Sequence, residues 1–178
     1  MAQTASEVFV ALTGGVYVDL EASPLTLPSS ATATLTSWTE LGYLDESGIV
    51  QSRGKDTTPL RAWQNGDTLR VLQTGDTVTY ALTLMQTNND VIEVLYGNRP
   101  NSGAWELTGD PLPVTRWVFD VFDGDEKIRV CIPHGQVTEV GDENFVNSDA
   151  KSHPITITAY PDSNGVKAYF YKSPVVGS

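Results

Sequence analysis

Long stretches of the chain alternate apolar and polar residues with a period of two, which strongly limits the folds it can adopt. Such alternation puts the apolar side chains on one face of a β-strand. The clearest case is the segment 77–85, where threonines alternate with Val78, Tyr80, Leu82 and Leu84. Residues 116–122 and 127–132 follow the same pattern. The sequence therefore predicts a mainly β fold built from half-buried strands.

Turn-forming pairs between these segments predict how the strands are connected. Asp123-Gly124 and Asn164-Gly165 each lie between two alternating segments. Such pairs favour the tight turns of β-hairpins, because their residues tolerate positive φ. We expect one hairpin around each pair. Two similar segments, 65–69 and 74–78, predict two further turns that bound one short strand.

Residues 87–97 depart from the alternation and predict a short helix. The segment opens with Thr87 and two asparagines, which are common helix caps, and closes on Gly97. Glycine suits the left-handed position that follows a helix. The β-branched residues of the segment leave a strand as the alternative. Together these elements predict an antiparallel β-sandwich or barrel with one short α-helix packed against it.

The length of 178 residues fits one domain with a real core. Residues 1–37 are rich in Thr, Ser and Ala, and they predict an extended N-terminal arm, or an edge strand followed by a loop. Residues 38–178 then form the single β-domain. The first residues do not resemble a secretion signal, and no apolar run approaches the roughly 20 residues of a membrane helix. We expect no membrane association.

Charge restricts the partners of the chain. With 22 acids against 11 bases the formal net charge is −11, which disfavours tight binding of DNA or RNA. The distribution is uneven: six acids precede the first base, Arg53, and three further bases follow closely at Lys55, Arg61 and Arg70. Ordinary surface charge explains this pattern, but patches of opposite sign also suit head-to-tail self-association.

Residues with catalytic or metal-binding chemistry are scarce. The single cysteine, Cys131, excludes an intrachain disulfide and a multi-cysteine zinc site, and its apolar neighbours predict a buried position. His134 and His153 each adjoin a proline, where we expect loop surface. No nucleotide-binding, hydrolase or zinc-protease motif is present. We expect no enzyme activity, no cofactor and no metal.

Three segments in order carry a resemblance to a known family. Residues 38–49, WTELGYLDESGI, are followed by a segment with basic residues and then by Arg61-Ala-Trp63. A threonine-rich strand then runs into the segment that ends Tyr96-Gly97, and a final hairpin follows. This order resembles the major tail tube proteins of long-tailed bacteriophages.

The resemblance implies a structural virion protein that assembles into hexameric rings, which stack into a hollow tube for DNA ejection. It implies a tail-tube-like β-sandwich with an extended arm and a long inter-strand loop. The implied partners are other copies of the chain, a tape measure protein, other tail proteins and DNA in transient, non-specific passage. The implied location is the tail of a virion whose proteins are made in the host cytoplasm.

The resemblance also implies roles for particular residues. The long loop after the Leu-Gly-Tyr strand reaches the adjacent ring, and its candidates here are Asp45, Glu46, Arg53, Lys55 and Asp56. The arm contacts neighbouring subunits, and its candidates are Val8, Phe9, Val10 and Tyr17. A separate argument from charge adds a third role: in such a tube, acids on the lumen wall would repel the phosphates of DNA, and the candidates are Asp67 and Asp76.

Two other functions stay open at this stage. One is the ring-forming tube protein of a contractile injection or type VI secretion system, which has a similar fold. The other is a carbohydrate-binding or adhesin-like β-sandwich, in which the four tryptophans would form a sugar-binding platform. Assembly into rings favours a tube protein, whereas a monomer that binds glycans favours the adhesin.

Overall fold

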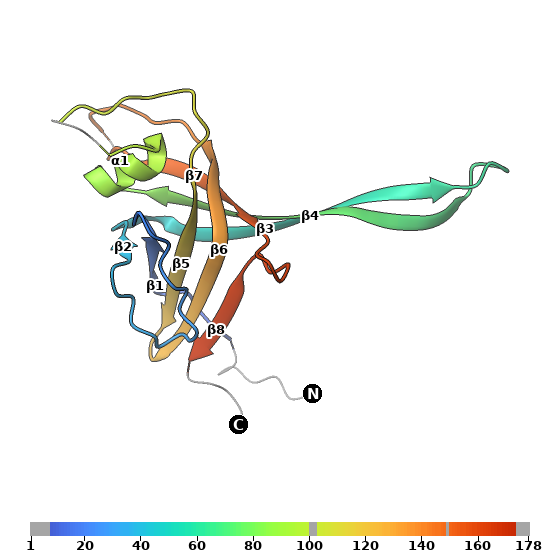
Figure 1. The fold of residues 1–178 in the computed structure, drawn as a ribbon, viewed down its shortest axis with the longest axis horizontal. Coiled ribbons are helices and arrows are strands. Elements are labelled where there is room, and N and C mark those ends of the chain that lie inside the picture. The colour runs from blue at the N-terminus through green and yellow to red at the C-terminus, as the bar shows by residue number, and fades with distance from the viewer. Residues whose placement is uncertain (1–7, 100–102, 149, 174–178) are drawn as a thin grey trace.

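The computed structural model describes residues 8–99, 103–148 and 150–173, and within them it has eight β-strands and one helix (Figure 1). The mainly β fold with a single helix is confirmed. The elements in chain order are β1 (Thr13–Val18), β2 (Thr39–Glu40), β3 (Leu44–Arg61), β4 (Thr68–Leu84), α1 (Asn89–Tyr96), β5 (Val114–Asp123), β6 (Glu126–Val140), β7 (His153–Tyr160) and β8 (Tyr169–Ser173).

All the strands belong to one antiparallel sheet with the order β2-β1-β5-β6-β7-β4-β3. The sheet branches at β6, which is long enough to pair with two partners along one side. Its first half, Lys127–Cys131, pairs with β8, and its second half, from His134, pairs with β7. Because the sheet is strongly curved, β3 and β4 cross over β5 and β6 instead of continuing beside them (Figure 1).

The core lies where the two parts of the curved sheet face each other. The Tyr80 ring of β4 packs edge-on against Phe119 of β5, with ring centroids 5.3 Å apart. Trp117 lies beside Phe119 and is almost completely buried. Apolar residues of α1 close one end of this core, namely Val91, Val94 and Leu95. The period-two alternation therefore predicted the buried face of β4 correctly.

The helix prediction is confirmed, with its cap one residue later than Thr87. Asn88 is the N-cap, and its side chain accepts a hydrogen bond of 2.9 Å from the Val91 amide. Gly97 ends the helix in the left-handed region, with φ of 75°. Its amide donates to the Glu93 carbonyl at 2.8 Å. Both ends of α1 therefore follow the capping rules that the sequence indicated.

Of the two predicted hairpins, only the first forms. Asp123 pairs with Glu126 around the turn that joins β5 and β6. The pair Asn164-Gly165 does form a turn, in which Gly165 has φ of 78°. However, β7 pairs with β4 and β6, while β8 pairs with a different part of β6. The second hairpin prediction was wrong because both edges of β7 are already occupied by longer strands.

The expectation of two turns around a short strand was also half wrong. Asn65 and Gly66 form a turn with positive φ values of 60° and 69°. Gly75, by contrast, lies inside β4 and pairs with Asp56, next to a register irregularity in the ladder. An irregularity of this kind bends a strand without ending it. One strand of 17 residues therefore replaces the predicted short strand.

Part of the predicted N-terminal arm belongs to the sheet. Strand β1 lies between β2 and β5, and Val16 and Val18 are fully buried in the core. The boundary expected at residue 37 therefore cuts through the β-domain. Residues 8–12 lie outside the core, although the Leu12 amide donates to the Phe122 carbonyl at 3.0 Å. Residues 1–7 lie outside the described part of the chain.

A buried ion cluster ties the segment between β1 and β2 to the sheet. The Arg129 guanidinium donates to both carboxylate oxygens of Asp120, at 2.7 and 2.8 Å. Its remaining nitrogen donates to the carbonyls of Ser30 and Ala33, at 3.2 and 2.6 Å. Lys127 Nζ lies 2.7 Å from the same carboxylate. One side chain therefore connects β6, β5 and the crossing segment.

Cys131 is buried, as predicted, and burial raises the pKa of its thiol to about 12. His153 is also fully buried, so the expectation of a surface position was wrong. Its Nε2 lies 3.0 Å from the Thr87 hydroxyl, and its Nδ1 lies 2.5 Å from the Glu143 carboxylate. Both ring nitrogens thus have partners, which allows burial without an unpaired polar atom.

We predict that Arg129→Leu lowers the free energy of unfolding by about 3–5 kcal/mol, because it leaves the buried Asp120 carboxylate without its main partner. Urea unfolding measures the loss. The double variant Arg129→Leu/Asp120→Leu removes both charges and should recover part of the stability. A single variant as stable as the parent would show that the cluster does not hold the fold.

A second prediction concerns pH. Partial burial raises the pKa of Glu143, but hydrogen bonds from His153 and Lys151 lower it by more, so it lies below its ordinary value of 4.5. A depressed folded-state pKa contributes stability above about pH 4.5, which is lost as the pH falls through the folded value. Glu143→Gln should therefore be less stable than the parent near pH 7. The gap should shrink in urea unfolding near pH 3.5, and a constant gap would contradict this.

Candidate assembly interface

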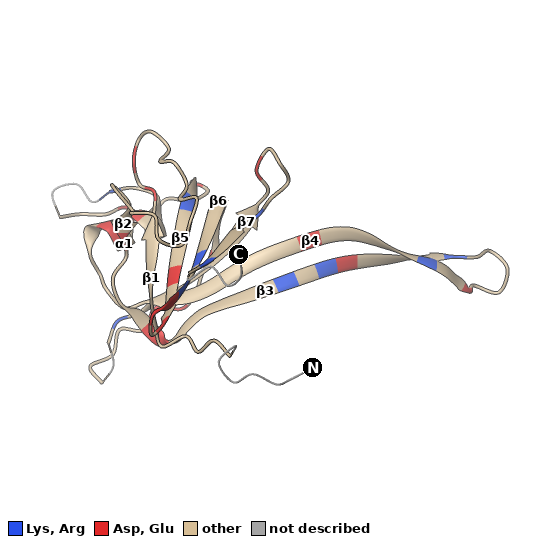
Figure 2. Ribbon diagram, turned by 90° about the horizontal axis from the view of Figure 1, so that it is seen from below, with Lys and Arg blue, Asp and Glu red and all other residues tan. Residues whose placement is uncertain are grey.

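The outer part of the β3–β4 hairpin projects from the body of the protein as a two-stranded ribbon (Figures 1 and 2). Strand β4 pairs with β7 only from Val78 to Leu84. Beyond Val78, β3 and β4 pair only with each other. We call residues 53–77 the ribbon. The long loop that was expected to contain Asp45 and Asp56 is therefore mostly part of strand β3, which pairs with β4 in a hairpin and has a register irregularity between Leu44 and Ile49.

Two features of the sequence shape the ribbon. Asn65 and Gly66 supply the positive φ values that its end turn needs, and the Ala62 amide donates to the Asp67 carbonyl at 2.7 Å across that turn. The register irregularity near Gly75 bends it. A two-stranded hairpin is only marginally stable alone in water, because neither face is covered. The ribbon therefore depends on contacts from outside its own strands.

Apolar side chains are exposed on both faces of the ribbon. Pro59 pairs with Val71, which shares a face with Leu69, and Leu69 is 68% exposed. Leu60 and Leu72 lie on the opposite face, where Leu60 pairs with Arg70. Trp63 at the end turn is 97% exposed. Exposed apolar surface of this extent is typical of an interaction site.

The ribbon differs in charge from the rest of the chain. It has four of the 11 bases and only three of the 22 acids, so the whole acidic excess of the chain lies outside it (Figure 2). Its four bases are Arg53, Lys55, Arg61 and Arg70. A basic projection on an acidic protein suits a contact with another copy of the same protein.

The structure separates the residues predicted for the inter-ring loop. Arg53, Lys55 and Asp56 lie at the root of the ribbon. Asp45 and Glu46 lie at the other end of β3, in an irregular segment before Ile49. There the Ser47 amide donates to Asp45, and this hydrogen bond lowers the pKa of the Asp45 carboxyl. The five candidates therefore form two sites.

The arm candidates are also divided. Val8 and Val10 are exposed and Phe9 is partly buried, which suits contacts with a neighbour. The Val10 amide donates to Asp123 at 2.7 Å, so this stretch runs beside the end of β5. Tyr17 lies within β1 and is half-buried. Burial, followed by the charge of Glu40, raises the pKa of its phenol.

The two lumen candidates lie at opposite ends of the ribbon. Asp67 follows the end turn and is exposed. Asp76 lies at the root, where Lys167 and Arg53 are 3.5 and 3.8 Å from its carboxylate. Nearby bases therefore offset the charge of Asp76. Their place in a lumen stays a prediction.

Sequence reasoning named Trp63 only as part of the family resemblance and of a possible sugar platform, and it missed the other apolar residues of the ribbon, Leu60, Leu69, Val71 and Leu72. Their signal was available: a tryptophan and several branched residues flank an Asn-Gly turn. The alternation there is poor, since Leu69, Val71 and Leu72 do not share one face. Both faces are apolar because neither covers a core within the subunit.

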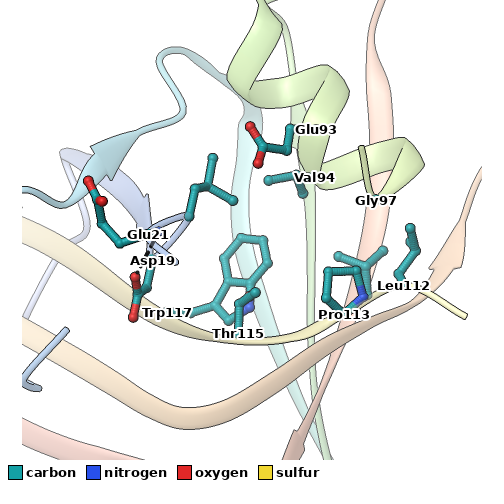
Figure 3. Close-up of a pocket in the computed structure, with 11 residues that line it drawn as sticks. Asp19, Glu21, Glu93, Val94, Gly97, Leu112, Pro113, Thr115 and Trp117 are labelled. Carbon is teal, nitrogen blue, oxygen red and sulfur yellow. Dashed lines mark hydrogen bonds between the residues drawn. The ribbon is translucent and has the colours of Figure 1, made fainter. Parts of the chain in front are cut away.

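A small cavity under α1 is a weaker candidate for a ligand site (Figure 3). It measures about 190 Å³, and Trp117 and Leu112 line it beside the helix. Two of its three acids have partners: Glu93 binds Arg99 at 2.9 Å, and Asp19 accepts from the Leu25 amide at 2.7 Å. Ligand pockets usually measure roughly 300–1,000 Å³. The cavity is better explained as a packing gap between helix and sheet.

The described residues contain no group of three or more His, Cys, Asp or Glu side chains placed to hold a metal ion. In the same part of the chain, no helix has the length and apolar character needed to span a membrane. The ribbon is our main candidate functional site because of its exposed apolar side chains, which are typical of a protein that works by association.

Comparison with known proteins agrees with this class. A model of the phage tail tube protein family matches residues 1–175. The chain therefore belongs to the phage tail tube protein family, and a structural role in the tail tube follows. No curated protein sequence matches it.

Among solved structures, one with a TM-score above 0.5 shows the same fold. A chain of the sheath–tube complex of an extracellular contractile injection system in its extended state has 9% identity and a TM-score of 0.53, covering 95% of this chain and 98% of that one. A chain from the tail of an empty GTA particle has 10% identity and a TM-score of 0.46, covering 95% and 98%. A chain from the anti-feeding prophage baseplate has 9% identity and a TM-score of 0.48, covering 99% of this chain and 100% of that one.

We predict that the ribbon is dispensable for folding of the body. Replacing residues 56–75 with Asn-Gly leaves the Lys55 and Asp76 pair joined by a two-residue turn of a favoured type. The ribbon covers no core residue, so circular dichroism and thermal unfolding should show a folded domain with nearly unchanged Tm. Loss of the cooperative transition would show that the ribbon stabilises its own subunit.

Proposed function

We propose that this chain forms hexameric rings that stack into the tail tube, through which DNA leaves the virion. The observation that carries the proposal is the uncovered ribbon in a member of the tail tube family. Within the ring, contacts between copies join the sheets. Between rings, the ribbon makes the contact, so one subunit bridges two layers of the tube.

Open strand edges support the ring. In the described residues, β3 pairs only with β4, and β8 pairs only with β6, so each leaves one edge unpaired. Unpaired edges invite association, and a closed ring removes them by sharing strands between neighbours. Phe170 of β8 is 54% exposed, which adds apolar surface at one of these edges. The exposed arm residues 8–12 supply a further contact between subunits.

The reach of the ribbon supports stacking. From Val78, where β7 stops pairing, β4 runs ten residues back to Thr68. At about 3.3 Å per residue the ribbon extends roughly 33 Å from the body. A projection of this length extends well past the subunit that bears it. It can therefore contact a copy in another layer as well as a neighbour in its own.

The acidic balance suits a conduit for DNA. A net charge of −11 opposes stable contacts with phosphates, so DNA passes without adhering. Only acids within about 8 Å of the DNA act strongly at physiological salt. Asp67 and Asp76 remain our candidates for the lumen wall, with Asp67 the less compensated of the two. A tape measure protein and other tail proteins complete the tail, whose subunits are made in the host cytoplasm.

The two alternatives have less support. The first alternative is the tube protein of a contractile injection or type VI secretion system. One chain of such a system shares the fold, but at 9% identity this likeness does not extend to function. The adhesin-like alternative relied on a platform of four tryptophans. Trp117 is only 1% exposed in the core, whereas Trp63 lies at the end turn of the ribbon. The four side chains therefore do not form one surface for a sugar.

Negative-stain electron microscopy of the purified protein tests the proposal. We expect six-fold rings or tubes at high protein concentration, and short tubes or isolated rings after replacement of residues 56–75 with Asn-Gly. A protein that stays monomeric by light scattering at every concentration, also when other tail proteins are added, would contradict ring formation. Tubes of unchanged length after the replacement would contradict the role of the ribbon.

A further inference from the structure

The ribbon needs a receptor with complementary properties. Three of its bases, Lys55, Arg61 and Arg70, form no ion pair within the described part of the chain. Its apolar residues are exposed on both faces. A matching receptor is concave, acidic and partly apolar, because such a surface covers the apolar atoms and balances the charges.

A groove at the opposite end of the hairpin has these properties. It measures about 740 Å³ and is formed by residues 11–14, Glu40, residues 42–46, Gly48, Ile49, Gln86 and Val121. Its charged residues are Glu40, Asp45 and Glu46, and no Lys or Arg is among the described residues that line it. All three acids are without an ion pair among the described residues.

The Leu-Gly-Tyr segment provides the apolar part of this groove. Gly42 has φ of 80°, a conformation that other residues adopt only with strain. The chain can therefore turn between Leu41, which is fully buried, and Tyr43, which is 76% exposed. The Gln86 side chain packs so closely over Gly42 that a Cβ atom there would collide with it. Tyr43 and Leu12 both line the groove, and both side chains are exposed there.

The groove and the tip of the ribbon are too far apart to meet within one subunit. The groove begins at the start of β3, and the end turn lies beyond Arg61. From Ile49 to Arg61 the extended strand spans roughly 40 Å. A contact between them therefore joins two different copies. Because donor and receptor are different surfaces, the contact repeats head to tail and builds an open stack.

We propose that the ribbon of one copy docks into this groove of a copy in the next ring. Arg61 and Arg70 approach the groove acids, and Trp63 and Leu69 cover Tyr43 and Leu12. This inference rests on the proposed function and adds the receptor site to it. Ribbon-to-ribbon pairing is less favourable, because it would bring the free bases of two ribbons together.

Photo-crosslinking in assembled tubes tests the contact directly. The photoreactive residue p-benzoylphenylalanine replaces Trp63, and ¹⁵N-labelled copies mixed with unlabelled ones show which crosslinks join two chains. We expect crosslinked peptides from residues 11–14 or 40–49 of another copy. Crosslinks to a second ribbon, or to the cavity under α1, would overturn the proposal.

Charge exchange gives an independent test. The groove variant Glu40→Lys/Asp45→Lys/Glu46→Lys should raise the protein concentration needed for tubes about tenfold or more at low salt, where screening is weak. Adding the ribbon changes Lys55→Glu, Arg61→Glu and Arg70→Glu to the same chain should restore most of the assembly. Exposed acids outside the groove supply a control with the same change in net charge, Glu106→Lys/Asp110→Lys/Asp142→Lys.

The outcomes separate the two proposals. If the parent protein forms no tubes even when the other tail proteins are added, the proposed function fails, and the groove proposal that rests on it fails too. If the parent forms tubes and the groove variant assembles like the control variant, the groove proposal is wrong and the tube function stands. A groove defect that the ribbon changes do not repair would also overturn the pairing, because it would show damage to some other contact.

Discussion

A ribbon of two strands has no interior in which side chains can be buried. The function that we propose for the whole molecule depends on this constraint. Each residue of the ribbon faces solvent on one side or the other, so its leucines, valine and tryptophan cannot be buried by folding of the subunit. Backbone pairing holds the strands together, but such a hairpin is only marginally stable in water. The apolar faces of the ribbon are therefore available to other molecules, and we propose that copies of the same chain cover them.

The body of the subunit supplies what a long projection requires, which is a rigid root. Strand β4 passes from the core into the ribbon without interruption, so Tyr80 and Leu82 fix its direction against Phe119 and β7. The Arg129 cluster holds the segment between β1 and β2 across the sheet. The ribbon is thus anchored in the core by a continuous strand and not by a loop. Such a design suits a tube that must stay straight.

How much the sequence predicts depends on how local the determining interactions are. The C-cap of α1 at Gly97 and the turn at Gly124 depend on neighbours in the chain, and both were predicted correctly, whereas the N-cap lies one residue beyond Thr87. The partner of β8 depends on which distant edge is free, and alternation carries no information about that. The surface position predicted for His153 was wrong for the same reason. Its partner Thr87 is distant in the sequence, and its partner Glu143 lies in a loop, so the sequence alone does not show that the folded chain brings them together.

The candidate site likewise has parts that the sequence could predict and parts that depend on the fold. The family resemblance singled out the segment that begins at Asp45 as a candidate for assembly, but its form as a strand depends on pairing with residues 68–84. The residues of the groove come from three separate parts of the chain, so only the fold brings Leu12, Glu40 and Gln86 together. Gly42 could be noticed in the sequence, but its purpose becomes clear only beside Gln86.

The central claim is that other copies cover the ribbon, and hydrogen–deuterium exchange measures this most directly. Amides of residues 56–61 and 68–74 should exchange quickly in the unassembled subunit, because this hairpin opens easily. In assembled tubes the same amides should exchange at least about a hundredfold more slowly, while buried amides of β5 change little. Ribbon amides that exchange equally fast in both states would show that assembly leaves the ribbon uncovered, and the account would be wrong.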